Sequence, residues 1–363
     1  MRFRSSLATA IAAAVAAVVF TAASQPVEAA TYTWRTSGSA VGGQYSSGVN
    51  WVGGVAAVSN TASTTLQFTS NTTTGSQATT NAVLGGFGVQ QFLVDGTTTY
   101  VQGSKLNFGS GGLINNTSTV FQSLNNVRAN DAGFSVTSTS GTLSLTNITG
   151  TATANVSFTG LGQKIVGDTL VGITNISGPL TFAGVGLGSD LTLNGGSVFM
   201  GSGGTGQLYV GGNFTGASAA TFYMAPSDST FSNVVGNVAY NDLNLVMNLD
   251  SLGDTVGQVP GTFWASVFGN ESAASYTGNL GSLVSTATTS PYVGLTWSQV
   301  GGNWQSSVYN TNQQLEFRPG TGAIYVVPEP TQMVFVAGVG AALGMWRMRK
   351  LRRNGRGSNA TAC

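Results

Sequence analysis

The chain of 363 residues contains no histidine and a single cysteine, and only 7% of its residues are charged. An ordinary globular protein has about 25% charged residues. Without histidine there is no Ser–His or Cys–His pair for nucleophilic catalysis and no imidazole ligand for a metal. The only cysteine, Cys363, is the last residue, so no disulfide bond can form within the chain. Stability therefore has to come from backbone pairing and apolar stacking.

The few charges are unevenly placed along the chain. Residues 31–326 carry a net charge of −5, from 5 basic and 10 acidic side chains, and the overall formal charge of +1 is due to the two ends. The basic residues of this region are Arg35, Lys105, Arg128, Lys164 and Arg318. Because phosphate binding needs clustered lysine and arginine, nucleic acid is not expected as a partner.

Motifs for catalysis and for cofactor binding are also missing. The chain has no P-loop, no G-x-S-x-G and no H-E-x-x-H. The glycines of 184–188 neither follow a βαβ unit nor open a helix, which predicts a turn. Asp242, Asp250 and Asp254 lack the spacing of a calcium loop and are interpreted as turn residues. We therefore expect no metal, no cofactor and no enzymatic activity.

Hydrophobic residues, at 41%, lie in short runs that alternate with polar residues. This alternation is typical of half-buried strands and is not found in disordered chains. The clearest runs are Gln91–Val94, Lys105–Phe108, Thr142–Leu145, Asn155–Phe158, Leu180–Phe182, Asp190–Leu193, Ser197–Met200 and Gln207–Val210.

Short echoes of Asn-x-(Ser/Thr)-Gly recur at irregular intervals, at Asn147, Asn175 and Asn213. Many short strands with turn signals suggest a solenoid, a sandwich or a barrel. We favour an all-β, irregular right-handed parallel β-helix, because asparagine tolerates the left-handed backbone of its turns. Low charge also suits this fold, since stacked like charges would repel each other.

Residues 237–326 differ from the preceding region and are expected to form a C-terminal β cap. They include Trp264, Trp297 and Trp304, and the segments 314–318 and 323–326 flank a turn that contains Pro319. These two segments predict a hairpin in which Glu316 and Arg318 share a face and pair.

The N-terminus has the order of a secretory signal peptide. Arg2 and Arg4 precede an apolar stretch from Leu7 to Ala23, and small residues follow at the expected cleavage site. We expect cleavage after Ala29 or Ala30, and export of everything that follows. An uncleaved N-terminal anchor is the alternative.

The C-terminus combines a short motif, an apolar run and a basic cluster. Pro328, Glu329 and Pro330 precede an apolar run from Thr331 to Trp346. As a helix this run would extend roughly 24 Å, and Val326 and Val327 are expected to add apolar length. The basic cluster, which predicts a cytoplasmic stop, consists of Arg347, Arg349, Lys350, Arg352 and Arg353.

This C-terminal order resembles the PEP-CTERM sorting signal of Gram-negative bacteria. The resemblance implies that Pro328, Glu329 and Pro330 are recognised by an exosortase, a membrane processing enzyme. It further implies a transient anchor in the inner membrane and then release to the cell surface or matrix. The tail beyond Arg353 departs from the usual pattern.

The start of the exported region resembles autotransporter-like β-repeat proteins that often carry such a tail. The resemblance rests on Trp34, Asn50-Trp51 and Leu66-Gln-Phe68. It implies that the aromatic residues cap the first turn of a solenoid, with a glycan-stacking platform as the alternative.

The predicted organisation is a signal peptide (1–30), a β-solenoid (31–236), a cap region (237–326), a sorting signal (327–353) and a cytoplasmic extension (354–363). The leading hypothesis is an exported structural protein of the surface or matrix that associates with exopolysaccharide. The alternative is a carbohydrate-binding module whose candidate stacking residues are Trp264, Trp297 and Trp304. A β-helix enzyme that cleaves polysaccharide is a third hypothesis, weakened by the missing acid–base groups.

Overall fold

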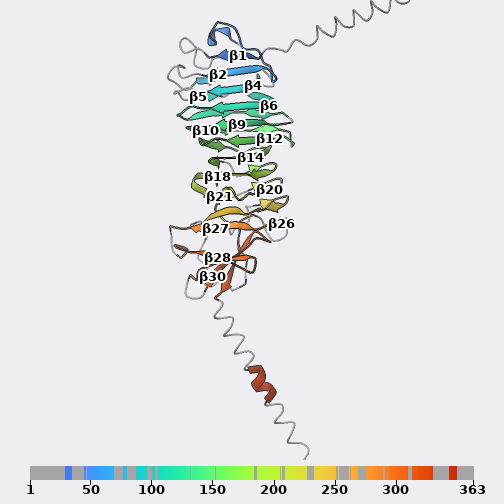
Figure 1. Cartoon of the computed structure of the whole chain (residues 1–363), viewed down its shortest axis with the longest axis vertical. Coiled ribbons are helices and arrows are strands. Elements are labelled where there is room, and N and C mark those ends of the chain that lie inside the picture. Colours follow the sequence, from blue (N-terminus) through green and yellow to red (C-terminus); the bar gives the residue numbers. More distant parts are fainter. Residues whose placement is uncertain are drawn as a thin grey trace, which may run out of the picture.

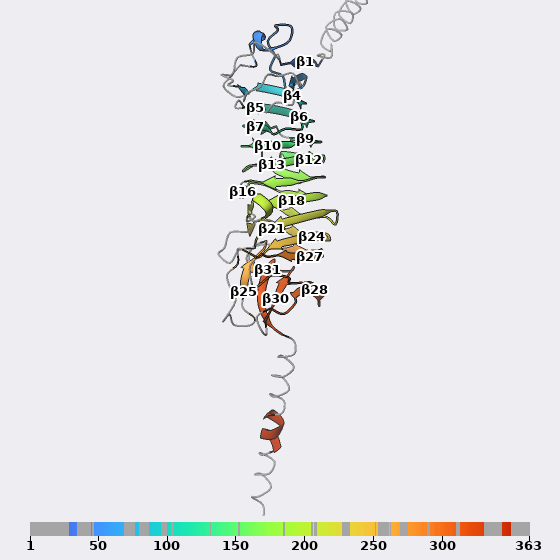
Figure 2. The same cartoon turned by 90° about the vertical axis from the view of Figure 1, so that its left-hand side faces the viewer.

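The structure, a computed structural model, describes residues 29–329 with internal gaps, together with a short helix at 343–349. The longest gaps are 35–44, 69–76, 80–86, 227–232, 253–260 and 269–274. Figure 1 shows an elongated stack of strands that begins at β1 (Ala30–Thr33) and passes β27 (Leu280–Thr286) before a smaller terminal sheet. The view turned by 90° shows the same succession of layers (Figure 2). The prediction of an all-β solenoid is confirmed.

The first face of the solenoid is a parallel ladder within a 13-stranded sheet. Successive turns of the chain add one strand each, so neighbours in the ladder are distant in sequence. Its strands after β1 are β2 (Thr64–Phe68), β4 (Phe87–Val94), β6 (Leu106–Asn116), β9 (Phe134–Ser138), β12 (Asn155–Thr159), β14 (Gly172–Asn175), β17 (Leu191–Leu193), β20 (Phe214–Thr215), β23 (Val238–Ala239) and β26 (Tyr276–Thr277).

The second face is a parallel 10-stranded sheet, and each of its strands follows a strand of the first face along the chain. Its strands before β27 are β3 (Gln77–Thr79), β5 (Tyr100–Gln102), β7 (Gln122–Asn125), β10 (Thr142–Thr146), β13 (Gln163–Val166), β15 (Leu180–Phe182), β18 (Gly196–Met200), β21 (Ala220–Met224) and β24 (Leu243–Asn248). The runs predicted as strands all contribute to one of the parallel ladders.

A third face is narrower and is interrupted at one turn. There Thr169 alone bridges Ile148 on one side and Leu187 on the other. Its strands are β8 (Val127–Ala129), β11 (Thr149–Gly150), β16 (Gly186–Leu187), β19 (Tyr209–Val210) and β22 (Asn233–Val234), and the loop between β18 and β19 holds the 3-10 helix η2 (Ser202–Gly204).

The length of a turn varies along the solenoid, as the irregular echoes predicted. The length of a turn equals the sequence separation of two residues that occupy equivalent positions in successive turns. Such residues stack on one another and are identified by the hydrogen bonds between them. The separations are 21 residues for Asn126–Asn147, 18 for Asp168–Gly186, 23 for Asp190–Asn213, 24 for Asn213–Asn237 and 38 for Asn237–Ser275.

The core consists of inward-pointing side chains that alternate with outward ones along each strand. In β24 the buried residues are Leu243, Leu245 and Met247, with half-buried residues between them. Asn126 and Asn147 occupy turns with φ of 58° and 52°. The expected role of asparagine in left-handed turns is therefore confirmed at these two positions.

Aromatic residues close the N-terminal end of the core. Trp34 and Trp51 form an antiparallel bridge next to the 3-10 helix η1 (Gly48–Asn50), and both side chains are fully buried. Their ring centroids lie 4.8 Å apart in an edge-to-face arrangement, and Phe68 packs against both. Their burial agrees with the structural role and leaves no ring face for a glycan.

The C-terminal end is covered by an antiparallel 5-stranded sheet. The predicted hairpin is confirmed, and within it the Arg318 Nε lies 2.6 Å from the Glu316 carboxylate. The parallel ladders run on to β27, so the solenoid extends beyond the predicted boundary at residue 236. The cap strands are β25 (Phe263–Ser266), β28 (Trp297–Val300), β29 (Asn303–Ser306), β30 (Gln313–Arg318) and β31 (Ala323–Pro328).

Candidate functional site: a notch in the third face

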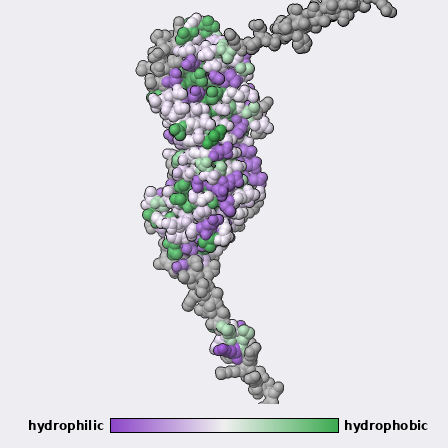
Figure 3. All heavy atoms as spheres, viewed as in Figure 1, coloured by the Kyte–Doolittle hydropathy of each residue, from purple (hydrophilic) through white to green (hydrophobic). Residues whose placement is uncertain are grey.

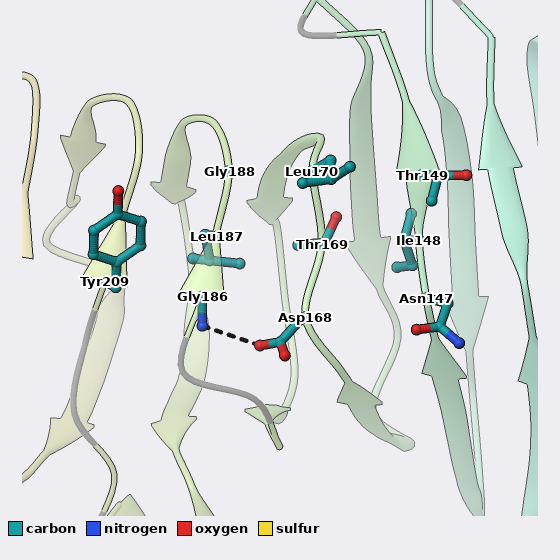
Figure 4. Close-up of a pocket in the computed structure, with 10 residues that line it drawn as sticks. All are labelled: Asn147, Ile148, Thr149, Asp168, Thr169, Leu170, Gly186, Leu187, Gly188 and Tyr209. Atoms are coloured by element: carbon teal, nitrogen blue, oxygen red, sulfur yellow. Dashed lines mark hydrogen bonds between the residues drawn. The ribbon is translucent and has the colours of Figure 1, made fainter.

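The described surface is hollowed on the third face, where the turns of the chain are shortest. We call this hollow the notch; its volume is about 360 Å³. Figure 4 shows the residues that line it, on four successive turns. They are Asn147, Ile148, Thr149, Asp168, Thr169, Leu170, Gly186, Leu187, Gly188 and Tyr209.

The register of the ladder explains why a hollow forms here. Gly186 pairs with Tyr209, and its amide donates a hydrogen bond of 3.1 Å to the Asp168 carboxylate on the other side. Leu187, between Gly186 and Gly188, points inward and is buried. Both outward positions of this turn are therefore glycine. The side chains of the two neighbouring turns project beyond it and form the walls of the hollow.

The glycine stretch predicted as a turn is in part a strand, since Gly186 and Leu187 form β16. A side-chain atom added at Gly186 would meet only the Asp168 carboxylate, at 3.7 Å. The missing side chain is thus not required by backbone packing at this position. Sequence reasoning missed Tyr209 and Asp168 as site residues because only stacking brings them to the two sides of Gly186.

The walls of the notch differ in chemistry. On one side Tyr209 is 42% exposed and on the other Leu170 is 62% exposed, beside the exposed carboxylate of Asp168. Such a combination of apolar surface and a few polar groups is typical of small-ligand sites. Elsewhere, the described surface in Figure 3 is mixed, with green hydrophobic residues scattered among pale and purple ones.

A second hollow, of about 370 Å³, adjoins the notch at Gly188-Ser189. It lies on the first face and has a polar lining, in which the Asn155 amide donates a 2.8 Å hydrogen bond to the Thr174 hydroxyl. Its lining residues are Thr153, Ala154, Asn155, Gly172, Ile173, Thr174, Ser189, Asp190 and Thr192.

The three tryptophans considered for glycan stacking do not form an exposed platform. Trp264 and Trp304 are only 8% and 9% exposed and belong to the core of the cap. Trp297 is half-buried, and its indole nitrogen donates a 2.9 Å hydrogen bond to the Ser285 hydroxyl. Trp297 thus joins the cap to β27, the last strand of the solenoid, whereas Trp264 packs against Tyr292 at a ring-centroid distance of 5.4 Å.

The sorting motif begins where the folded body ends. Pro328 is the last residue of β31, in register with Gln313, and both Pro328 and Glu329 are half-buried. Val326 and Val327 also lie in β31, so they do not lengthen the apolar run of the tail as expected. Pro330 lies outside the described residues.

The predicted membrane segment falls largely on residues 330–342, which are outside the described part of the chain. Among the residues that are described, no helix is both long and apolar enough to cross a bilayer. Arg347 and Arg349 are exposed on the helix at 343–349. Lys350, Arg352 and Arg353 are not among the described residues, and neither are residues 1–28 of the predicted signal peptide.

The aspartates considered for calcium are not brought together within the described residues. No group of three or more potential ligands is found there, and Asp254 lies outside them. Asp242 has a left-handed backbone, with φ of 61°, which agrees with the interpretation as a turn residue. Asp250 accepts two hydrogen bonds from Thr288 in the next turn.

Lys164 is an unexpected polar residue of the core. It is fully buried on the second face, in register with Leu143 and Leu180. Its ammonium group donates hydrogen bonds to the carbonyl oxygens of Thr159, Gly160 and Ser177, at 3.3, 2.6 and 3.1 Å. Burial lowers the pKa of Lys164 to about 8.

This lysine predicts an unusual pH dependence of stability. Between pH 8 and about 10 the unfolded chain holds a proton that folded Lys164 has released, so the free energy of unfolding should rise with pH. We expect a rise of roughly 2 kcal/mol by pH 9.5 that is absent in Lys164→Met. Chemical denaturation of both proteins from pH 7 to 9.5 measures it, and parallel curves would refute it.

The upper pH limit of this measurement is set by two tyrosines. Burial raises the pKa of Tyr276 to about 12 and that of Tyr240 well above its ordinary value. Their stabilisation is complete below pH 10 and is lost as the pH rises further, because the unfolded tyrosines then ionise. Below pH 9.5 the lysine effect is therefore observed separately.

No protein-family model, no curated protein and no solved structure matches this chain.

Proposed function

We propose that this chain is an exported structural protein of the cell surface or extracellular matrix that associates with exopolysaccharide. It is a right-handed solenoid, the hand preferred for parallel crossovers. A signal peptide directs export, and the C-terminal helix anchors the chain in the inner membrane until an exosortase acts on the sorting motif. The function requires no catalysis, cofactor or nucleic acid.

One observation carries this proposal. The parallel ladders continue from β1 to β27, and the last strand, β31, ends at Pro328, the first residue of the proposed sorting motif. The first described strand begins at Ala30, at the expected cleavage site, so the described rod lies between the two proposed processing signals. A rigid rod delivered whole to the surface is suited to a structural role, because stacked turns give a long repetitive face.

The sorting part of the proposal predicts a processed C-terminus. Mass spectrometry of the extracellular form from the native host should show an end near residue 328. Changing Pro328, Glu329 and Pro330 to alanine should leave the protein in the inner membrane with residues 347–353 intact. Pro319→Ala, in the neighbouring hairpin turn, is the matched control and should be processed normally.

Two results would contradict this proposal. If the wild-type protein retains residues 347–353, it is a plain single-span membrane protein and is not released. If the purified chain turns over a polysaccharide and loses that activity when an aspartate is replaced, the non-enzymatic role is wrong.

A carbohydrate-binding module remains the second candidate. It is favoured by the notch, with its exposed Tyr209, rather than by the tryptophans of the cap.

A further inference from the structure

The notch offers an exposed aromatic ring and a carboxylate on opposite sides of a glycine floor. Tyr209 and Asp168 lie on the turns that flank Gly186, as Figure 4 shows. The backbone amide of Gly186 already donates to Asp168, which fixes that carboxylate at the wall and leaves further lone pairs for a ligand. Figure 4 shows the face of the Tyr209 ring turned toward the viewer and its edge toward Gly186, so a ligand can lie over the ring and reach the carboxylate across Gly186.

The spacing of the turns sets the width of the ligand. Neighbouring strands of a sheet lie about 4.8 Å apart, so the turns of Tyr209 and Asp168 are about 10 Å apart. A ligand that lies over the tyrosine reaches the carboxylate through a polar group at its edge, because a hydrogen bond spans about 3 Å. A single saturated ring with apolar C–H groups on its face and hydroxyls at its edge has this character.

The second hollow extends the site in one direction. It meets the notch at Gly188-Ser189, across the corner between the third and first faces. Its exposed polar groups include Asn155 and Asp190, and the Asp190 carboxylate accepts bonds from Asn213 in the next turn. A polymer that places one ring in the notch can thus place the following rings over hydrogen-bonding groups.

Charge restricts the type of polymer. Asp168 lines the notch and Asp190 lines the second hollow, and the whole exported region has 10 acidic against 5 basic residues. Desolvating a carboxylate of the ligand beside these aspartates would be unfavourable. Uronic-acid polymers are therefore poor ligands for this site.

We infer that the notch binds one ring of a neutral, unbranched polysaccharide, stacked on Tyr209 and hydrogen-bonded to Asp168. The neighbouring rings of the same strand lie in the second hollow, so the glycan crosses the rod from the third face to the first. The polysaccharide class rests on the proposed function, whereas the position and neutrality of the ligand rest on the site.

The test measures binding of neutral oligosaccharides to the full chain in mild detergent by calorimetry. The probes are β-1,3-gluco-, cello- and manno-oligosaccharides of one to six units, with oligogalacturonate as the acidic probe. We expect at least one neutral series to bind with an affinity that increases with length over the first units, and oligogalacturonate to bind more weakly than that series.

Three substitutions locate the site. Gly186→Thr fills the notch at a position where a Cβ finds space and should reduce the affinity at least about ten-fold. Tyr209→Ala should reduce it by a similar factor, because the stacking surface is lost. Asp168→Asn keeps an acceptor oxygen and should retain binding of neutral probes within about three-fold.

Two controls match these substitutions elsewhere on the molecule. Gly320→Thr makes the same change at an open position of the β30–β31 turn. Tyr223→Ala removes a half-buried tyrosine that stacks on Phe199 on the second face. Both variants should bind as the wild type does.

The inference is overturned if no neutral probe binds, if Gly186→Thr binds like the wild type, or if oligogalacturonate binds as tightly as the neutral series. These outcomes are separate from the proposed function. Loss of export with intact binding rejects the sorting proposal alone, and correct processing without binding rejects this inference alone.

Discussion

Replacing Phe268 by alanine should lower the free energy of unfolding of the C-terminal end by about 3–5 kcal/mol. Phe268 is fully buried, and its ring packs against three other aromatic rings. The centroid of its ring lies 4.8 Å from that of Phe214, 6.1 Å from that of Phe222 and 5.4 Å from that of Tyr240. Its backbone amide donates to the carbonyl of Gly322 in the cap hairpin. One side chain therefore joins the last turns of the solenoid to the sheet that covers them.

The same segment supplies the control for this substitution. Phe263, in β25, is 43% exposed and stands edge-to-face to Tyr325, so Phe263→Ala should cost less than about 1.5 kcal/mol. Hydrogen exchange of the full chain should show lost protection in β30, β31 and the last turns for Phe268→Ala only. Equal destabilisation by the two substitutions would show that Phe268 does not connect the solenoid to its cap.

Replacing Gly178 by alanine should destabilise the middle of the solenoid by about 3 kcal/mol. Gly178 has φ of 72°, and a Cβ there would lie 2.0 Å from the carbonyl oxygen of Gly160 in the previous turn. The left-handed backbone costs about 1–2 kcal/mol for alanine, and relieving the contact costs about 1–3 kcal/mol more. The same atom would also approach the ammonium group of Lys164, at 2.9 Å.

Gly186→Ala is the matched control for Gly178→Ala. Its φ is not positive, and its nearest neighbour, the Asp168 carboxylate, is 3.7 Å from the added atom. We expect this control to change the midpoint of thermal or denaturant unfolding little, whereas Gly178→Ala should lower it clearly. If the two variants unfold alike, close packing in the bend between β14 and β15, where Gly178 lies, does not limit the stability of the solenoid.

The strands of this protein could be predicted because their signal is local. Alternation of apolar and polar residues places successive side chains on opposite sides of a strand, whatever lies beside it. The hairpin of β30 and β31 was predictable for the same reason, and so was the pairing of Glu316 with Arg318, which are two residues apart on one strand. Asparagine in left-handed turns follows from its own side chain.

Lys164 shows where local information is insufficient. In the run Gln163-Lys-Ile-Val, the lysine is buried and Ile165 is only half-buried. The direction in which each residue points is set by stacking on Leu143 and Leu180 in the adjacent turns. A shift of one residue in this register would exchange all inward and outward side chains of the strand.

The notch depends on tertiary structure in the same way. Gly186, Asp168 and Tyr209 are unremarkable in sequence, and they form a site only because one short turn lies between two others. The burial of Trp264 and Trp304 in the hydrophobic core likewise depends on tertiary packing, which the residues around them in sequence do not specify.

Local alternation and turn residues, together with low charge, were enough to predict an all-β solenoid, because alternation and turn preference act within a few residues. Which residues of neighbouring turns contact each other was decided only by the tertiary structure. Residues that pair in successive turns are 16 to 38 positions apart, so no fixed repeat relates one turn to the next. Each change in the length of a turn alters which side chains contact each other across the turns. The notch, the burial of Lys164 and the close contact at Gly178 therefore could not be predicted from the sequence and required the tertiary structure.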